Sequence, residues 1–164
     1  MLEGLYDLLA RAGRPRICIV GDMMLDLYVW GEVSRISPEG PIPVLRVERK
    51  EPRPGGAGSV AAMLSSLEAE VIPVALIGSD AAGVTLGTEL QNAGMETSGL
   101  VSSAERPTTT KTRYLGYVQS AGRGLQQIVR VDDELTAPLS PQEASQVRKA
   151  ALGAMERADL VVLQ

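Results

Sequence analysis

The sequence predicts an α/β fold, a mostly parallel sheet flanked by helices, with a small antiparallel β-layer inserted into it. Short continuous apolar runs alternate with segments whose apolar residues recur at helical spacing, which is typical of parallel strands joined by helices. Two stretches, 28–50 and 108–132, instead alternate apolar with polar residues. That pattern indicates antiparallel strands with one exposed face, and so a small inserted β-layer that could serve as a lid or as a pairing surface.

The first half of the predicted body contains two helices and two strands. Leucines among charged residues over 2–11 predict a short amphipathic helix and not an export signal. The apolar run Arg16–Val20 is the first buried strand, a helix is expected over 55–70, and the run Val71–Ile77 is the next strand.

The second half continues the same alternation. A helix is expected over 81–93, where Gly94 stands in the position of a C-terminal cap, and a short strand over 99–102. Ser140 and Glu143 are spaced as a capping box ahead of a long helix that leads into a strand over 159–163.

Composition narrows the function. A net charge of −4 disfavours a broad nucleic-acid surface. No histidine is present and no apolar run is long enough to span a membrane, so a histidine base, a histidine-based zinc site and a membrane protein are all disfavoured. The single cysteine, Cys18, lies inside an apolar run and fits a reducing compartment. We expect a cytoplasmic protein without a bound structural metal.

Two acids follow the first strand, at the carboxyl end where open parallel sheets bind ligands. Asp22 and Asp26 stand in the segment GDMMLD. A carboxylate there can accept two hydroxyl hydrogen bonds, as sugar-binding sites often require. Asp22 could equally cap the turn, which leaves Asp26 as the better candidate.

A glycine-rich segment, PGGAGS, enters the helix over 55–70. Its backbone N–H groups would point toward the ligand side of the sheet. The segment lacks the Gly-Lys-Ser/Thr ending of a phosphate-binding P-loop and does not follow the first strand, so it fits no nucleotide fingerprint. A simple structural turn is the alternative interpretation.

Basic residues gather in the second β-layer segment. Strand alternation puts Lys111 and Arg113 on one face, with Arg130 on the next strand of the same hairpin. The three side chains could hold a phosphate, although charged strand residues often only face solvent.

Taken together, five blocks carry a family resemblance. They are GDMMLD, SRISPEGPIPVLRV, RPGGAGSVA, PTTTKTR and QQIVRVDDE, in this order. From about Arg16 to Gln164 the chain resembles the N-terminal part of the kinase module of bifunctional heptose-7-phosphate kinase/heptose-1-phosphate adenylyltransferases, within the ribokinase-like, phosphofructokinase-B-type sugar kinases. The first and third blocks are shared across that wider group, and the SRISPE and TTTKTR blocks favour the heptose branch.

The resemblance implies transfer of phosphate from ATP, with Mg²⁺, to the anomeric hydroxyl of D-glycero-D-manno-heptose 7-phosphate, a step toward ADP-heptose and lipopolysaccharide. It implies that the sugar phosphate is the small-molecule partner and that the β-lid closes over it. The family usually has Asn where this chain has Ser59, which puts the identity of the sugar in question. The substrate-binding residues expected on these grounds are Asp26, Gly55, Gly56, Ser59, Lys111, Arg113 and Arg130.

The family's catalytic Asp and nucleotide site are expected beyond Gln164, so we expect no catalytic residue, no strong ATP binding and no turnover from residues 1–164 alone. One interpretation is a fragment of an active kinase. The alternative is a naturally truncated, non-catalytic module for sugar-phosphate binding or oligomerisation. Free β-layer edges also predict a homodimer formed through the lid.

Overall fold

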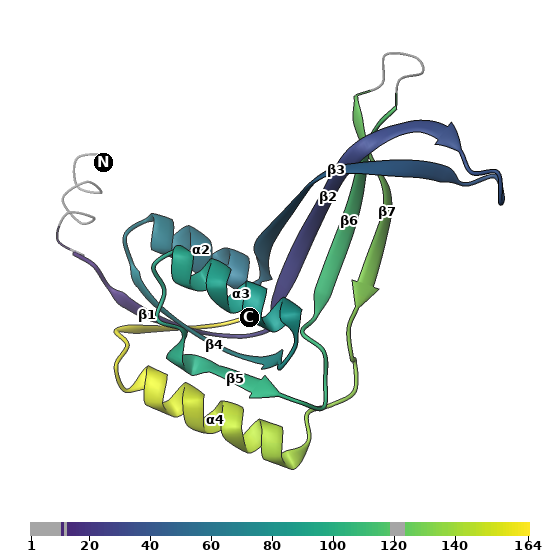
Figure 1. Cartoon of the computed structure of the whole chain (residues 1–164). Coiled ribbons are helices and arrows are strands. Elements are labelled where there is room, and N and C mark those ends of the chain that lie inside the picture. The colour runs from purple at the N-terminus through teal and green to yellow at the C-terminus, as the bar shows by residue number, and fades with distance from the viewer. Residues whose placement is uncertain (1–10, 12, 119–123) are drawn as a thin grey trace.

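The computed structural model describes residue 11, residues 13–118 and residues 124–164. The helix expected over 2–11 lies almost wholly outside these residues, as does most of the turn expected at Gly122-Arg123-Gly124. The described chain forms two sheets, a parallel one covered by helices and a second one that projects away from it (Figure 1).

The first sheet is parallel throughout and has the order β5-β4-β1-β8. Its strands follow the apolar runs seen in the sequence, because such runs can be buried on both faces of a parallel sheet. The strands are β1 (Arg16–Val20), β4 (Glu70–Gly78), β5 (Leu100–Ser103) and β8 (Leu160–Leu163). The predicted body strands are confirmed within one or two residues.

Helices cover both faces of this sheet (Figure 1). α2 (Ala57–Ser66) and α3 (Ala81–Asn92) lie on one face, and α4 (Pro141–Met155) lies on the other. Alternate residues of β1 serve the two faces. Ile17 and Ile19 pack into the core under α2 and α3, whereas Cys18 packs into the core under α4. A short 3₁₀ turn, η1 (Thr97–Gly99), precedes β5.

The helix starts follow local hydrogen-bonding rules. Ser140 and Glu143 form the predicted capping box at the start of α4, with Pro141 in its first turn. Asp80 caps α3 by accepting a hydrogen bond from the Gly83 amide at 2.7 Å.

The second sheet has the order β3-β2-β6-β7 and forms the β-lid. Its strands are β2 (Met23–Ile36), β3 (Pro43–Gly56), β6 (Thr110–Val118) and β7 (Leu125–Asp133). β2–β3 and β6–β7 are antiparallel pairs, as expected, but the central pair β2–β6 is parallel. The lid is therefore a mixed sheet, and β2 and β3 reach further toward the body than the segment 28–50.

Two polar networks hold the base of the lid against the body. Asp80 accepts hydrogen bonds from the backbone amide and the hydroxyl of Thr108, at 2.8 and 2.7 Å, just before β6 begins. Glu143, at the start of α4, accepts a hydrogen bond from the Ser103 hydroxyl at 2.7 Å and lies 3.5 Å from Arg106. Both segments that connect the body to β6 and β7 are thus anchored.

Within the described residues, no helix is long and apolar enough to cross a membrane.

Candidate functional site

Asp26 lies on β2, a few residues beyond the carboxyl end of β1. Its neighbour Leu25 is buried at 4% exposure and packs into the body core. Because strand side chains alternate, Asp26 points to the opposite face of the lid sheet. Lys111 on β6 is its register partner on one side and Arg53 on β3 is its partner on the other.

The glycine-rich entry lies directly beside Asp26. A Cβ atom added to Gly55 would come within 2.8 Å of the Asp26 carboxylate carbon and of its Oδ2. Gly56 has a φ of 57°, a left-handed conformation that favours glycine, and the next amide, of Ala57, donates to the Asp22 carbonyl at 2.9 Å. The structure therefore brings both glycines and Asp26 to one place.

Ser59 differs from the other predicted residues. It is exposed in the first turn of α2, and its hydroxyl donates to the Gly56 carbonyl at 2.8 Å. The hydrogen bond described for this hydroxyl is thus local to its own helical turn and not directed at the Asp26 carboxylate.

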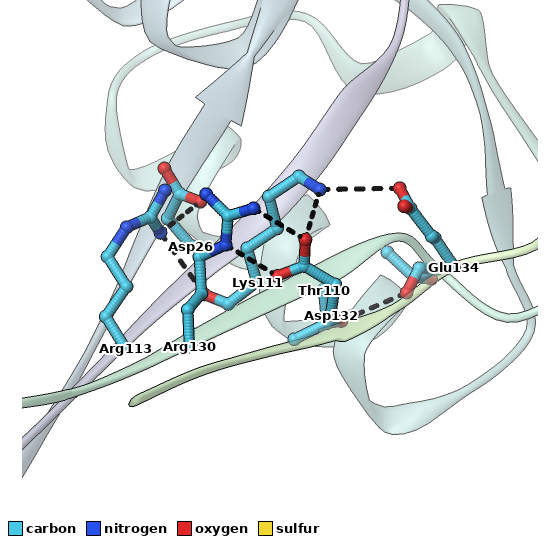
Figure 2. Close-up of polar contacts among 8 residues, drawn as sticks. Asp26, Thr110, Lys111, Arg113, Arg130, Asp132 and Glu134 are labelled. Carbon is cyan, nitrogen blue, oxygen red and sulfur yellow. Dashed lines mark hydrogen bonds and ion pairs between the residues drawn. The ribbon is translucent and has the colours of Figure 1, made fainter. Parts of the chain in front are cut away.

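The three predicted basic residues gather on the same face as Asp26, as Figure 2 shows. Arg113 Nη1 donates to Asp26 Oδ1 at 2.6 Å, and the two side chains are only 20% and 18% exposed. Lys111 Nζ donates to Asp132 at 3.1 Å. Arg130 donates to the same carboxylate from Nε and Nη2, at 2.9 and 3.0 Å. Each cation therefore already holds a carboxylate.

These ion pairs shift the pKa values of Lys111, Arg113 and Asp132. The hydrogen bond to Asp132 raises the pKa of Lys111, and the hydrogen bond to Asp26 raises the pKa of Arg113. The hydrogen bond from Lys111 is also the main reason why the pKa of Asp132 is lowered. These shifts favour the charged forms of Lys111, Arg113 and Asp132.

Two aromatic residues extend this face along β2. Tyr28 lies under the guanidinium groups of Arg53 and Arg113, with Cζ-to-centroid distances of 4.8 and 5.2 Å. Trp30 stacks on Tyr28 and carries Arg49 over its ring at 4.8 Å. Cation–π contacts of this kind hold a guanidinium in position while leaving its N–H groups available to other partners.

Sequence reasoning did not single out Asp132, Glu134 or Tyr28 as site residues. Glu134 Oε2 is a second carboxylate partner of Lys111, at 3.3 Å. Two signals could have found Asp132 and Tyr28. The alternation of Arg130 with Asp132 puts them on one face of β7, and Tyr28 is two residues from Asp26 on the same face of β2.

A cavity of about 610 Å³ lies next to this cluster at the carboxyl ends of β1 and β4. It is lined by Asp22 and Met24 but not by Asp26. Its polar lining includes Glu134, Thr109 and Arg106, and the Arg106 guanidinium already donates to the Ala137 carbonyl at 2.9 Å.

The residues around this cavity offer little to hold ATP with Mg²⁺. Its only basic lining residue among those described, Arg106, is engaged by a carbonyl and by Glu143. In the part of the chain that the structure describes, no group of three or more Cys, Asp or Glu side chains could hold a metal ion. We therefore assign no step of phosphate transfer to a nucleotide or metal bound by these residues.

A family model for pfkB family carbohydrate kinases matches residues 14–162 of the chain. The chain belongs to the pfkB family of carbohydrate kinases. This assignment confirms the ribokinase-like fold predicted from the sequence.

Curated relatives of this pfkB family chain include proteins described as bifunctional protein HldE. The protein from Rhodopseudomonas palustris (strain HaA2) is 43% identical over 156 residues, which is 95% of this chain and 31% of that protein. The protein from Wolinella succinogenes is 38% identical over 156 residues, again 95% of this chain and 31% of that protein. The chain thus spans about a third of the length of these relatives, and the predicted resemblance to bifunctional heptose kinases is confirmed.

Solved structures share the fold of this family member. A carbohydrate kinase from Agrobacterium tumefaciens superimposes with a TM-score of 0.66 and 21% identity, covering 91% of this chain and 45% of that one. Arabidopsis thaliana ribokinase, solved in complex with ribose and ATP, gives a TM-score of 0.54 and 19% identity, covering 92% of this chain and 53% of that one. At these identities the likeness concerns the fold.

Proposed function

We propose that this chain is the sugar-binding part of an ATP-dependent kinase that phosphorylates the anomeric hydroxyl of D-glycero-D-manno-heptose 7-phosphate on the route to ADP-heptose. The observation that carries the proposal is the meeting of Asp26, Gly55 and three cations on one face of the lid, beside the carboxyl edge of the parallel sheet. Similarity to bifunctional HldE proteins supports the choice of heptose.

In this proposal each group has a distinct role. Asp26 accepts hydrogen bonds from sugar hydroxyls and fixes the orientation of the ring, while Gly55 keeps the surface beside it open. Arg113, Arg130 and Lys111 neutralise the 7-phosphate, since guanidinium and ammonium groups bind phosphate through charge-assisted hydrogen bonds. Ser59 offers one hydroxyl where the family usually has an amide.

We also propose that residues 1–164 bind the sugar phosphate without turning it over. Support comes from the cavity chemistry, because Arg106 is already engaged and the described residues contain no cluster of three or more Cys, Asp or Glu side chains that could hold a metal ion. Incubation of the purified chain with ATP, Mg²⁺ and heptose 7-phosphate should give no ADP above a blank, and measurable turnover would contradict this proposal.

The assignment of Asp26 is tested by calorimetric titration of heptose 7-phosphate into the wild-type chain and two variants. Asp26→Ala should weaken binding by about 1.5–3 kcal/mol, the range for hydrogen bonds to charged groups. Asp22→Ala is the matched control, since Asp22 is an exposed acid four residues earlier. No binding by wild type, or equal affinities of wild type and Asp26→Ala, would overturn the proposal.

We further propose that the partner of the lid is a second copy of the chain. The face of β7 opposite Arg130 exposes Val129 and Val131, which are 48% and 51% exposed. β7 is also an edge strand of the sheet, as is β3, and an edge with exposed apolar residues favours pairing with another strand.

A further inference from the structure

The Asp26 carboxylate is occupied by the chain itself. Its Oδ1 accepts the Arg113 Nη1–H at 2.6 Å, and roughly four-fifths of each side chain is buried. Gly55 packs closely against Oδ2, because a Cβ added to Gly55 would lie only 2.8 Å from this oxygen. Hydrogen bonds from two adjacent sugar hydroxyls use both carboxylate oxygens, so one hydroxyl competes with Arg113 for Oδ1.

The charges of the cluster balance in this state. Its cations are Lys111, Arg113 and Arg130, and the carboxylates that they contact are Asp26, Asp132 and Glu134. A phosphate entering this balanced cluster must therefore replace a carboxylate on a cation. Arg113 is the candidate, since Lys111 and Arg130 share Asp132 whereas the contact of Arg113 with Asp26 is a single hydrogen bond.

The surroundings of Arg113 suit such an exchange. Tyr28 lies under its guanidinium at 5.2 Å, and the Lys111 carbonyl accepts a second hydrogen bond from Nη1 at 3.2 Å. These contacts do not depend on Asp26, so they can keep the guanidinium in place when the carboxylate leaves. Arg130 is the direct cross-strand partner of Arg113 and brings a second guanidinium to the same position.

We propose that the Asp26–Arg113 ion pair is a latch that a ligand opens fully only when it carries both hydroxyls and a phosphate. The hydroxyls take Asp26, and the phosphate takes its place on Arg113. If an unphosphorylated sugar drew Asp26 away, it would leave a largely buried guanidinium without its anion, which is unfavourable. The latch thereby selects sugar phosphates over sugars, and it rests on the proposed role of Asp26 in sugar binding.

The latch predicts opposite effects for its two halves. Asp26→Asn removes the competing carboxylate, so inorganic phosphate should bind about tenfold more tightly than to wild type, whereas the heptose should bind more weakly. Arg113→Gln frees Asp26, so the unphosphorylated heptose should bind about tenfold more tightly, whereas heptose 7-phosphate should bind more weakly. A purely structural ion pair would give no gain in either variant.

Calorimetric titrations of inorganic phosphate, the heptose and heptose 7-phosphate into wild type and both variants test this directly. Arg46→Gln is the control, because Arg46 is an exposed lid arginine that pairs with Glu32 and Glu48; its affinities should equal those of wild type. Unchanged or weaker phosphate binding by Asp26→Asn, or unchanged heptose binding by Arg113→Gln, would overturn the latch.

The phosphate titration contains no sugar. It therefore tests the latch even if wild type does not bind heptose 7-phosphate and the proposed function is wrong.

If circular dichroism shows that either variant is unfolded, a measurement on wild type alone supplies the test. Saturating phosphate should raise its affinity for the heptose about tenfold relative to chloride at equal ionic strength, because phosphate bound to Arg113 frees Asp26 for the hydroxyls. No change in heptose affinity would overturn the latch.

Discussion

Asp26 and Gly55 depend on each other. The carboxylate occupies the space that a side chain at position 55 would fill, and Met24 Cγ, at 2.9 Å from the same point, closes another side. The glycine is therefore required by close approach, and its backbone is not in the left-handed region. Any larger residue must displace Asp26 from Arg113 or move the β2–β3 pair.

Gly55→Ala should lower the free energy of unfolding by about 1–3 kcal/mol, the usual effect of overpacking a filled site. It should also weaken binding of heptose 7-phosphate, because the methyl group pushes on the Asp26 carboxylate. Urea unfolding followed by circular dichroism measures the first effect and calorimetry the second. Gly87→Ala in α3 is the control, since nothing lies within 4 Å of its added Cβ; a loss there equal to that of Gly55→Ala would contradict the account.

At this scale the sequence could predict which residues meet, but not their pairing. Lys111, Arg113 and Arg130 follow from strand alternation, and Asp26 follows from its place after a buried strand. Their carboxylate partners follow from the register of β2 on β6 and of β6 on β7. Each of these registers brings together residues far apart in the chain, and no local pattern fixes them.

Two of the segments that join the lid to the body are the one before β6 and the one after β7. Arg106 in the first segment donates to the Ala137 carbonyl in the second at 2.9 Å. Glu143 contributes to both, because it lies 3.5 Å from Arg106 and accepts the Ser140 amide at 2.8 Å. These two segments are therefore held together by Glu143, which is 7% exposed.

Acid should weaken this junction. Hydrogen bonds, first from Ser103 and then from Ser140, hold the pKa of Glu143 below its ordinary value. Burial raises the pKa of Asp80, but hydrogen bonds from Thr108 and Gly83 outweigh it and leave the pKa lowered. A carboxyl group with a depressed folded pKa contributes stability above its unfolded pKa, at about 4, and loses it as the pH falls through the folded value.

The free energy of unfolding, measured in urea, should thus fall as the pH drops from about 6 to below 4. Glu143→Gln should be less stable than wild type at neutral pH, and the difference should shrink in acid as wild type loses the contribution of Glu143. Glu156→Gln, at an exposed acid after the end of α4, is the control. If the difference in the free energy of unfolding between wild type and Glu143→Gln stays constant with pH, ionised Glu143 does not stabilise the junction.

The edge of the lid leads to a prediction about assembly. Val131→Lys places a charge on the exposed apolar face of β7 and should convert a dimer into a monomer in multi-angle light scattering. Leu163→Lys is the matched control, because Leu163 is 74% exposed on β8, an edge strand of the other sheet. A wild-type monomer at high concentration, or dissociation caused by Leu163→Lys alone, would count against dimerisation through the lid.

For the molecule as a whole, the order of strands and helices was predictable and the joining of the lid was not. Apolar runs and helical spacing predict the body strands because these patterns are local. The parallel pairing of β2 with β6 was missed, since it joins segments separated by two helices and two strands of the body. This pairing makes the two β-layer segments one sheet and puts Asp26 and Arg113 on one face.

The central claim is that the lid face around Asp26 is the sugar-phosphate site. NMR titration of heptose 7-phosphate into the ¹⁵N-labelled chain tests it most directly, because each backbone amide reports on its own surroundings. We predict that the largest amide shift changes fall at Asp26, Gly55, Arg113 and Arg130. Changes confined to residues of the neighbouring cavity, such as Thr109 and Thr136, or no changes at all, would contradict the claim.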